Sequence, residues 1–377
     1  MPYDVIVVGA GPAGSSAAYH LAAAGRKVLV LEKDNFPRYK PCGGGISLKA
    51  LPLLDFDWQS AVESMPRTIL FSYHPERQFR VELEKPLVYM VMRDRFDTLL
   101  ADRAQRAGAE IKYGFPVEDV SVERGGVTVK TGDGNSYRAS YVLGADGAAS
   151  KVAKSLNLMK GRLFGAAVAV EVQLEPGAPA RHDEVIKVDC GAVPMGYGWV
   201  FPKAGRVSAG VGTYRKDINL NQCADQYLTR EGLTNGVILR QGHLLPADGG
   251  KKNAFTAHRA MLLGDAAGLA DPLTGEGIYY ALKSGALAAG AIIQKDNPGQ
   301  VTASYRERIR QSIFPELSAA SCLAALFFRF TGLVFKLLQI NPDLARYFTD
   351  AMFEDNSYRK FIAEHKFLKV IREASVN

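Results

Sequence analysis

The fold of the amino-terminal region is decided by residues 3–32, which read YDVIVVGAGPAGSSAAYHLAAAGRKVLVLE. Two valine-rich apolar runs, Tyr3–Val8 and Lys27–Glu32, flank a glycine turn and an alanine-rich stretch that extends to about Ala24. Apolar runs of this length predict buried strands, and the alanine-rich stretch predicts a helix. We therefore expect this segment to form a complete β–α–β unit.

Three glycines stand at the turn of this unit. Gly9, Gly11 and Gly14 form the pattern GxGxxG between the predicted strand and the predicted helix. Glycines in this position make the turn tight, let the backbone approach a pyrophosphate and leave free N–H groups at the start of the helix. Glu32 ends the second strand where an acceptor for a ribose 2′-hydroxyl is expected. Glycines also make ordinary tight turns, but the complete β–α–β setting favours dinucleotide binding.

Strand and helix patterns alternate along the rest of the chain. Residues 70–92 have the alternation of strands, residues 93–107 have the spacing of an amphipathic helix, and YVLGAD is expected to be a buried strand that ends at Asp146. Residues 163–245 are rich in strand patterns and predict a separate antiparallel sheet. The small-residue segment around residues 260–293 then returns to the character of the nucleotide domain.

Two later motifs bear on the identity of the nucleotide. GADGAAS at residues 144–150 and LLGDAAGLADPLTGEGI at residues 262–278 resemble the paired DG and GD motifs of flavoproteins related to aromatic hydroxylases. The resemblance implies FAD, with Asp265 at a ribityl hydroxyl and with Gly277 and Ile278 near the isoalloxazine. Asp265 could instead have a structural role, as a helix cap or as a turn residue at the end of a strand.

Two further stretches are similar to the geranylgeranyl reductase family, namely PRYKPCGGG at residues 37–45 and YGWVFPK at residues 197–203. The similarity covers roughly the first three hundred residues and includes RDRFD at residues 93–97. It implies an FAD-dependent enzyme that reduces isoprenoid carbon–carbon double bonds. It also implies a set of residues at the FAD: Ala13, Glu32, Cys42, Gly43, Gly45, Arg93, Val117, Asp265, Gly277 and Ile278, in addition to the glycines of the turn.

For four residues, both a functional and a structural interpretation stay open. Cys42 is a candidate catalytic residue that could donate a proton, and simple packing against the flavin is the other interpretation. Tyr197, Trp199 and Phe201 would present an aromatic wall to an apolar substrate, although a core strand would show the same aromatics.

Together these patterns predict an α/β fold with a discontinuous, Rossmann-like FAD-binding domain, an antiparallel-sheet substrate domain and a carboxyl-terminal helical region. The expected boundaries are 1–65, 90–160 and 250–297 for the FAD-binding domain, 66–89 and 161–249 for the substrate domain, and 298–377 for the helical region.

Composition limits the partners, the metal sites and the cellular compartment that we expect for this protein. The 377 residues are 47% hydrophobic and carry a net charge of +7, with Lys and Arg scattered along the chain, so we expect no nucleic-acid partner. The four cysteines are dispersed and the six histidines lack metal-ligand spacing, so we expect no metal site and a reducing compartment. The amino terminus runs directly into a strand without a signal-peptide pattern, which predicts a cytoplasmic protein.

The most apolar stretch is Leu317–Ile340, which Arg329 and Lys336 interrupt, so it should not span a bilayer. Two interpretations stay open: an amphipathic helix that contacts a membrane peripherally or covers an apolar cavity, and an ordinary buried core helix.

Rival functions stay open as well. A flavin-dependent monooxygenase or halogenase can use the same scaffold, although halogenases typically carry WxWxIP where this chain has YGWVFP. A quinone-linked electron-transfer flavoprotein and a flavin-binding carrier without turnover are further alternatives. Because no second GxGxxG follows, we expect the electrons to come from a transiently bound reduced nicotinamide or from a protein such as ferredoxin.

Overall fold

The computed structural model describes residues 2–74, 76–161, 163–175, 185–247, 254–354 and 358–364. The chain folds into two compact units, each built from three separate stretches of sequence. Unit 1 comprises Met1–Tyr39, Asp94–Leu163 and Pro246–Leu317, and unit 2 comprises Lys40–Arg93, Phe164–Leu245 and Ser318–Asn377. The chain therefore passes repeatedly between the two units.

Unit 1 is built on a sheet whose central strands are parallel. β1 (Tyr3–Val8) pairs in parallel with β2 (Val28–Glu32) on one side and with β11 (Ser136–Gly144) on the other. β2 is buried along its whole length, as expected of an apolar strand that is covered on both faces. The sheet is extended by β8 (Glu110–Tyr113) next to β2, by β18 (Ala260–Leu262) and β17 (Thr256–Ala257) next to β11, and by the hairpin of β9 (Val117–Glu123) and β10 (Gly126–Thr131).

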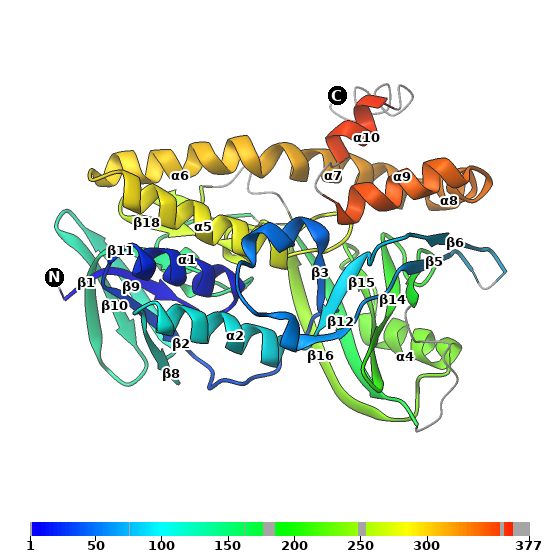
Figure 1. Cartoon of the computed structure of the whole chain (residues 1–377), viewed down its shortest axis with the longest axis horizontal. Coiled ribbons are helices and arrows are strands. Elements are labelled where there is room, and N and C mark those ends of the chain that lie inside the picture. The colour runs from blue at the N-terminus through cyan, green and yellow to red at the C-terminus, as the bar shows by residue number, and fades with distance from the viewer. Residues whose placement is uncertain are drawn as a thin grey trace. The chain divides into compact units, whose positions relative to one another are not determined.

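Small residues let the helices of unit 1 lie close together. α1 (Pro12–Ala23) packs against α5 (Ile278–Gln294), which in turn packs against α6 (Pro298–Ser312), so that α5 lies between the other two (Figure 1). The Ser16 hydroxyl donates a hydrogen bond of 2.9 Å to the carbonyl of Leu282, which fixes α1 to α5. Unit 1 also contains α2 (Arg93–Arg106), apart from its first residue, and α3 (Lys151–Ser155).

Unit 2 is built on a sheet in the order β16–β12–β15–β14–β13–β5–β6. These strands are β5 (Thr68–Ser72), β6 (Gln78–Glu82), β12 (Phe164–Gln173), β13 (Val185–Asp189), β14 (Gly196–Lys203), β15 (Arg206–Thr213) and β16 (Val237–Pro246). The pairs from β12 to β13 are antiparallel, as predicted, and β13 and β5 are parallel. The parallel pair departs from the expected pattern because β5 comes from a distant part of the chain, so no tight turn dictates its direction.

The two faces of this sheet differ in what they contact. One face packs against α4 (Leu220–Glu231), through a cluster that includes Val170, Val200 and Val211 from the sheet and Tyr227 and Leu228 from the helix. The opposite face carries Tyr197, Trp199 and Phe201, because side chains alternate along β14. The YGWVFPK motif thus places its aromatic side chains on the face opposite α4.

Unit 2 also contains a small sheet next to the glycine loop. β7 (Val88–Val91) pairs with β3 (Gly45–Ser47) and with β4 (Val62–Ser64), and the turns η1 (Leu48–Leu53) and η2 (Gln59–Ala61) lie between them in sequence. This pairing explains why residues 40–64 belong to unit 2. The boundaries predicted above assign the same residues to the FAD-binding domain. The compact units of the structure and the predicted domains therefore divide this part of the chain at different positions.

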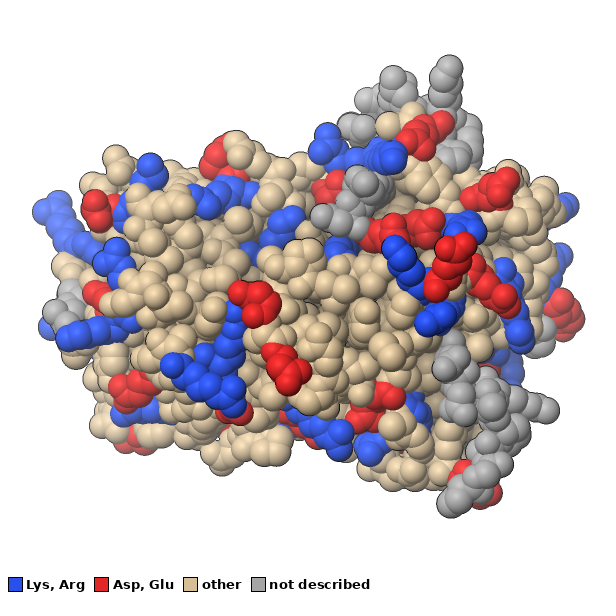
Figure 2. Space-filling view, viewed as in Figure 1, with Lys and Arg blue, Asp and Glu red and all other residues tan. Residues whose placement is uncertain are grey.

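The carboxyl-terminal helices are α7 (Phe314–Arg329), α8 (Thr331–Ile340), α9 (Pro342–Phe353) and α10 (Tyr358–Glu364). The apolar stretch Leu317–Ile340 is therefore two helices that meet at Phe330. Within the described residues no single helix is long and apolar enough to cross a membrane, while α6 and α7 pass that test of length and composition as a pair bent by 45°. On the face shown in Figure 2, basic and acidic side chains are interspersed among uncharged ones.

Candidate flavin site and substrate face

The glycine turn of unit 1 has the shape of a phosphate-binding cradle. Gly9 has a φ of +98°, and a methyl group on it would lie 2.5 Å from the carbonyl oxygen of Ala145. A methyl group on Gly14 would overlap the carbonyl oxygen of Gly9. By contrast, the nearest atom to a methyl group on Gly11 would be Arg38 Nη2 at 3.9 Å, so there is space above the start of α1. The free N–H groups of the first turn face this space.

Glu32 lies beside this turn at the end of β2. Its carboxylate is buried and accepts hydrogen bonds from the backbone N–H groups of Ala10, at 2.6 Å, and Asp34, at 3.0 Å. A carboxylate has about four acceptor positions, so two backbone bonds leave capacity for a ribose hydroxyl. Its position next to the glycine turn agrees with the role predicted from the spacing.

Arg38 is a component of this site that the sequence did not single out. Its guanidinium pairs with the buried Asp97 at 2.9 Å and lies 4.7 Å from the centre of the Phe36 ring. The other terminal nitrogen, Nη1, is buried and has no hydrogen-bond partner within the described residues. A buried donor left open beside Gly11 fits an anionic ligand such as a diphosphate. Arg38 stands in the PRYKPCGGG motif, but the motif alone did not indicate its role, because arginine is also common on exposed loops.

The second part of the unit 1 site is the turn between β18 and α5. Asp265 lies in the turn η4 (Gly264–Ala267), and a methyl group on Gly277 would lie 3.3 Å from Asp265 Oδ1. Gly277 caps α5, which begins at Ile278, so these three predicted residues lie together. Asp271 supports the intervening loop, since its Oδ1 accepts hydrogen bonds from Leu273 N at 2.7 Å and Thr274 N at 3.1 Å.

The two parts of the unit 1 site are connected through Ala13. Ala13 is buried in the first turn of α1, and a methyl group on Gly264 would lie 3.3 Å from its Cβ. Gly285 of α5 leaves no room for a side chain against the Ala13 carbonyl. The start of α1 and the turn that carries Asp265 are thus held in contact, which allows one extended nucleotide to meet both.

Asp146 of the GADGAAS motif has a structural role. Its carboxylate accepts hydrogen bonds from Ser150 Oγ at 2.6 Å and from the N–H groups of Lys151 and Val152 at 2.7 and 3.1 Å, and thereby caps α3. Burial raises the pKa of Asp146, and these hydrogen bonds oppose that shift. The strand predicted to reach Asp146 ends at Gly144, because the chain turns there to form the cap.

Two further predicted cofactor residues, Val117 and Arg93, are placed less specifically. Val117 is buried at the start of β9, two residues after Phe115, whose N–H donates to the Glu32 carbonyl at 2.8 Å. Arg93 is the first residue of α2 and is buried, at the end of a stretch assigned to unit 2. Their roles at FAD remain predictions.

The glycine loop at Cys42 belongs to unit 2 and packs tightly on its own surroundings. A methyl group on Gly43 would lie 2.6 Å from the Phe201 ring, one on Gly44 would overlap the Val91 carbonyl, and one on Gly45 would lie 2.9 Å from the Val88 side chain. Cys42 is half-buried, and its Sγ accepts a hydrogen bond of 3.4 Å from Gly44 N–H. Contact with β7 and β14 therefore accounts for these glycines, and the loop brings Cys42 to the aromatic strand.

The aromatic face of β14 is continuous and lies over small residues. The rings of Tyr197 and Trp199, and those of Trp199 and Phe201, are each 6.3 Å apart between centroids. Gly210 on β15 has no room for a side chain because the Trp199 indole occupies that position. Ala167 and Ala169 of β12 continue the cluster. Three aromatic rings above glycine and alanine form an apolar surface, in which the Trp199 ring is inclined by 63° to that of Tyr197 and by 41° to that of Phe201.

A buried polar group ends this apolar face. Lys203 Nζ lies 3.0 Å from Glu171 Oε1 and 3.3 Å from Met92 Sδ, and both charged side chains are almost fully buried. Glu171 Oε2, Ser208 Oγ and Trp199 Nε1 are buried without a hydrogen-bond partner within the described residues. The strand register puts all of these side chains on the face of Phe201. These atoms can bond to water or to a polar group of a ligand.

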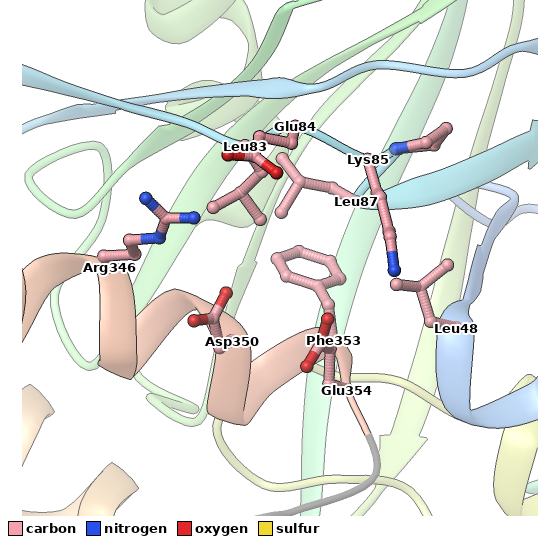
Figure 3. Close-up of a pocket in the computed structure, with 10 residues that line it drawn as sticks. Leu48, Leu83, Glu84, Lys85, Leu87, Arg346, Asp350, Phe353 and Glu354 are labelled. Atoms are coloured by element: carbon pink, nitrogen blue, oxygen red, sulfur yellow. The ribbon is translucent and has the colours of Figure 1, made fainter.

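Two depressions of the surface contain none of the predicted site residues. A cavity of about 220 Å³ in unit 2 is lined by Leu87 and Phe353, which face each other, and by charged residues of α9 and the β6–β7 loop (Figure 3). Burial raises the pKa of Asp350 there, Glu354 adds to the shift and Arg346 opposes it. A second hollow of about 260 Å³ lies between α4 and the start of β16. The mixed charge of the first cavity gives no sign of an apolar substrate.

Comparison with known proteins decides which family has this arrangement. The family described as FAD binding domain matches residues 2–192. Geranylgeranyl diphosphate reductase of Rhodobacter capsulatus is 35% identical over 309 residues, which cover 77% of this chain and 75% of that protein. This chain belongs to the geranylgeranyl reductase family of FAD-dependent oxidoreductases.

Other relatives show the breadth of the family. Menaquinone reductase of Mycobacterium tuberculosis is 34% identical over 78% of this chain and 77% of its own length. A geranylgeranyl bacteriochlorophyll reductase-like structure from Thermoplasma acidophilum is 25% identical, with a TM-score of 0.77 over 98% of this chain and 99% of that one. The flavin-dependent brominase Bmp2 shares the fold, with a TM-score of 0.73 at 20% identity over 99% and 98% of the two chains.

The unit 1 site fits the FAD that this family binds. The cradle above Gly11, the open donor of Arg38 and the acceptor capacity of Glu32 are the groups that a diphosphate and a ribose require. Asp265 and the start of α5 offer a second acceptor and further N–H groups in the same unit. Each predicted residue keeps its role at FAD as an expectation, and Arg38 is added to them.

Proposed function

We propose that this protein is an FAD-dependent reductase of isoprenoid carbon–carbon double bonds, acting on geranylgeranyl diphosphate, on a prenylated lipid or on a chlorophyll-type tail. The observation that carries the proposal is the apolar aromatic face formed by Tyr197, Trp199 and Phe201 over glycine and alanine. Such a surface suits a long, methyl-branched apolar chain better than a compact polar substrate. Relatives named geranylgeranyl diphosphate reductase support the same class of reaction.

Different residues of the chain have different roles in this reaction. Bound FAD, in its reduced form, would supply hydride to one alkene carbon. The glycine turn, Glu32 and Arg38 hold the diphosphate half of the cofactor, and Asp265 holds its ribityl half. The aromatic face of β14 holds the prenyl chain and excludes water, which keeps an unreactive alkene positioned.

Cys42 is the proposed source of the proton for the other alkene carbon. Its half-buried thiol is held by the Gly44 N–H, in a loop that contacts Phe201. Replacing Cys42 by alanine should lower turnover far more than it weakens FAD binding, because the loop glycines that shape the site are retained. Full turnover by the alanine variant would assign the proton to another group or to water.

The test of the function is an anaerobic assay of the flavin-loaded enzyme with a chemical reductant. We expect mass spectrometry to show geranylgeranyl diphosphate, or a lipid with that chain, gaining two hydrogens for each reduced bond. A flavin-loaded, reducible enzyme that leaves every prenyl substrate unchanged would rule the proposal out. Comparing reduced nicotinamide with reduced ferredoxin in the same assay would identify the electron donor.

A prenylated quinone is the second candidate substrate. The menaquinone reductase relatives support it, since their identity and coverage are close to those of the geranylgeranyl diphosphate reductases. Menaquinone in place of the diphosphate would discriminate between the two. A monooxygenase or halogenase would instead require oxygen, and YGWVFP differs from the halogenase motif WxWxIP.

We infer a cytoplasmic location with peripheral membrane contact. The support is indirect: the proposed substrates are apolar and reside in or next to membranes, and the dispersed cysteines suit a reducing compartment. Fractionation of cells into soluble and membrane pools, with and without high salt, would test it.

A further inference from the structure

The most exposed apolar surface among the described residues lies on α8. Eleven large hydrophobic side chains are exposed in that part of the chain, and four of them fall within residues 330–340. They are Phe330, Leu333, Leu337 and Ile340, with exposed fractions of 47%, 60%, 38% and 67%. The spacing of three, four and three residues puts them in one stripe along the helix. We call these four side chains the α8 stripe.

The opposite side of α8 is firmly attached to unit 2. Phe335 and Leu338 are buried, and the Phe335 ring lies 5.7 Å from that of Tyr73 and 5.1 Å from that of Phe79. Gln339 donates a hydrogen bond of 3.1 Å to the Gln78 carbonyl at the edge strand β6. Figure 1 shows α8 and α9 beside β5 and β6. The helix is therefore apolar on both sides, and only one side has a partner among the described residues of unit 2.

The charged side chains of α8 and of the end of α7 are basic, and the next acidic side chain along the chain is the exposed Asp343 at the start of α9. Residues 317–342 contain no Asp or Glu, whereas Arg329 and Lys336 are exposed on the same segment. Arg329 lies 5.7 Å from the centre of the Phe330 ring, so one cation adjoins the apolar stripe directly. An exposed apolar stripe with flanking basic side chains is the pattern of a helix that lies in the interface of an anionic bilayer.

We propose that the α8 stripe docks on the surface of an anionic lipid bilayer, with Phe330, Leu333, Leu337 and Ile340 among the acyl chains and with Arg329 and Lys336 at the headgroups. A protein partner or a second copy would need complementary acidic residues, and the segment offers this surface none of its own. The inference deepens the peripheral location proposed above. It does not depend on the reaction, because lipid binding by α8 requires no flavin chemistry.

The first test is binding of the full-length, flavin-loaded protein to phosphatidylcholine vesicles with and without phosphatidylglycerol, measured by flotation. The double variant Leu333→Ser/Ile340→Ser should bind about ten-fold or more weakly, because two side chains can no longer enter the bilayer. The matched control is Ile238→Ser/Leu244→Ser on β16, which removes two side chains that are 54% and 44% exposed and should bind like the wild type.

A charge variant separates the two contributions. Arg329→Gln/Lys336→Gln should lose about thirty-fold on anionic vesicles, since each basic side chain near such a surface contributes about 1 kcal/mol, and should be unchanged on neutral ones. Equal binding of all variants to the vesicles would overturn the proposal. So would a wild-type dimer that the Leu333→Ser/Ile340→Ser variant abolishes while vesicle binding is absent, since the stripe would then belong to a second copy.

Loss of the fold could also explain weaker vesicle binding by the variants. A fluorescence signal that a variant gains on docking excludes this explanation. The two native tryptophans, Trp58 and Trp199, are 3% and 7% exposed. In the variant F330W, the added emission should shift to shorter wavelength on anionic vesicles and should be quenched by brominated lipid. An emission that stays that of a solvated indole would contradict docking by this stripe, whatever the activity of the enzyme.

Discussion

Arg38 combines a buried ion pair with an unused donor beside the glycine turn. Replacing it by glutamine should weaken FAD binding roughly ten- to hundred-fold, the effect of losing a hydrogen bond to a charged group. The measurement is titration of the apoprotein with FAD, followed by flavin fluorescence. Arg106→Gln, which removes an exposed arginine at the end of α2, is the control and should leave the affinity unchanged.

The same substitution removes the ion pair that Arg38 makes with the buried Asp97, which by itself destabilises the protein. The double variant Arg38→Gln/Asp97→Asn separates the two effects. It should regain much of the free energy of unfolding of the apoprotein but not the affinity for FAD. Recovery of both would show that Arg38 acts through the fold alone.

Asp146 and Asp133 should give opposite dependences of stability on pH. Burial raises the pKa of Asp146, so its contribution is fully present below the unfolded value of about 4 and is lost as the pH rises through the folded pKa. The hydrogen bond from Thr131 is the main cause that lowers the pKa of Asp133, so its contribution is present above about pH 4 and is lost as the pH falls through the folded pKa.

Urea unfolding at a series of pH values tests this pair. The free energy of unfolding of Asp146→Asn, minus that of the wild type, should rise with pH by at most about 1.4 kcal/mol per unit within the window. The same difference for Asp133→Asn should fall as the pH rises. Parallel curves for the wild type and Asp146→Asn would mean that the folded and unfolded pKa values of Asp146 are equal.

At the scale of elements, the contact between α1 and α5 controls the shape of the unit 1 site. A side chain on Gly285 would collide with the Ala13 carbonyl and would lie 3.0 Å from Ala17 N. Gly285→Ala should therefore force the helices apart, cost about 1–3 kcal/mol and weaken FAD binding, because Ala13 and Ile278 begin the same two helices. Thermal unfolding and FAD titration measure the two effects.

Gly290 on α5 provides the matched control. A methyl group there would lie 3.4 Å from Arg308 Nη1, at the end of a flexible side chain. Gly290→Ala should be neutral or should stabilise the protein by up to about 1 kcal/mol, since alanine is the better helix former. If both variants behave alike, the close contact at Gly285 does not position α5.

Elements defined by local pattern were predictable, and those defined by distant partners were not. β1, α1 and β2 follow from consecutive apolar runs and a glycine turn, and α2 follows from its helical spacing. The parallel pair of β13 and β5 joins distant parts of the chain, and no local rule selects it. The break between α7 and α8 likewise depends on a contact elsewhere, since Gly332 lies against the Tyr73 ring.

The candidate site shows the same division. Gly9, Gly11, Gly14 and Glu32 could be found because their spacing is itself the signal. Arg38 could not, because its importance depends on Asp97 and on a donor left open in the folded chain. Lys203 and Glu171 were missed for the same reason, since they lie on different strands and meet only through the strand order of unit 2.

At the scale of the whole molecule, FAD should stabilise the protein through the half of the nucleotide that unit 1 binds. At a free concentration of one hundred times Kd, a ligand adds about 2.7 kcal/mol, which corresponds to roughly 5–10 °C in Tm for a unit of this size. FMN lacks the adenylate half and cannot reach Glu32 and the Gly11 turn together with the flavin position. It should therefore raise Tm much less than FAD at the same concentration.

The variant Glu32→Gln tests whether the stabilisation by FAD depends on Glu32. It keeps an acceptor for the Ala10 N–H but loses the acceptor for the Asp34 N–H and the charge that favours a ribose hydroxyl, so the Tm of the apoprotein should fall somewhat and the FAD-induced rise in Tm should shrink. Glu118→Gln, at an exposed position of β9, should respond to FAD like the wild type. Equal shifts with FMN and FAD, or an unchanged FAD shift in Glu32→Gln, would mean that the dinucleotide is held elsewhere, and that the glycine turn serves only the fold.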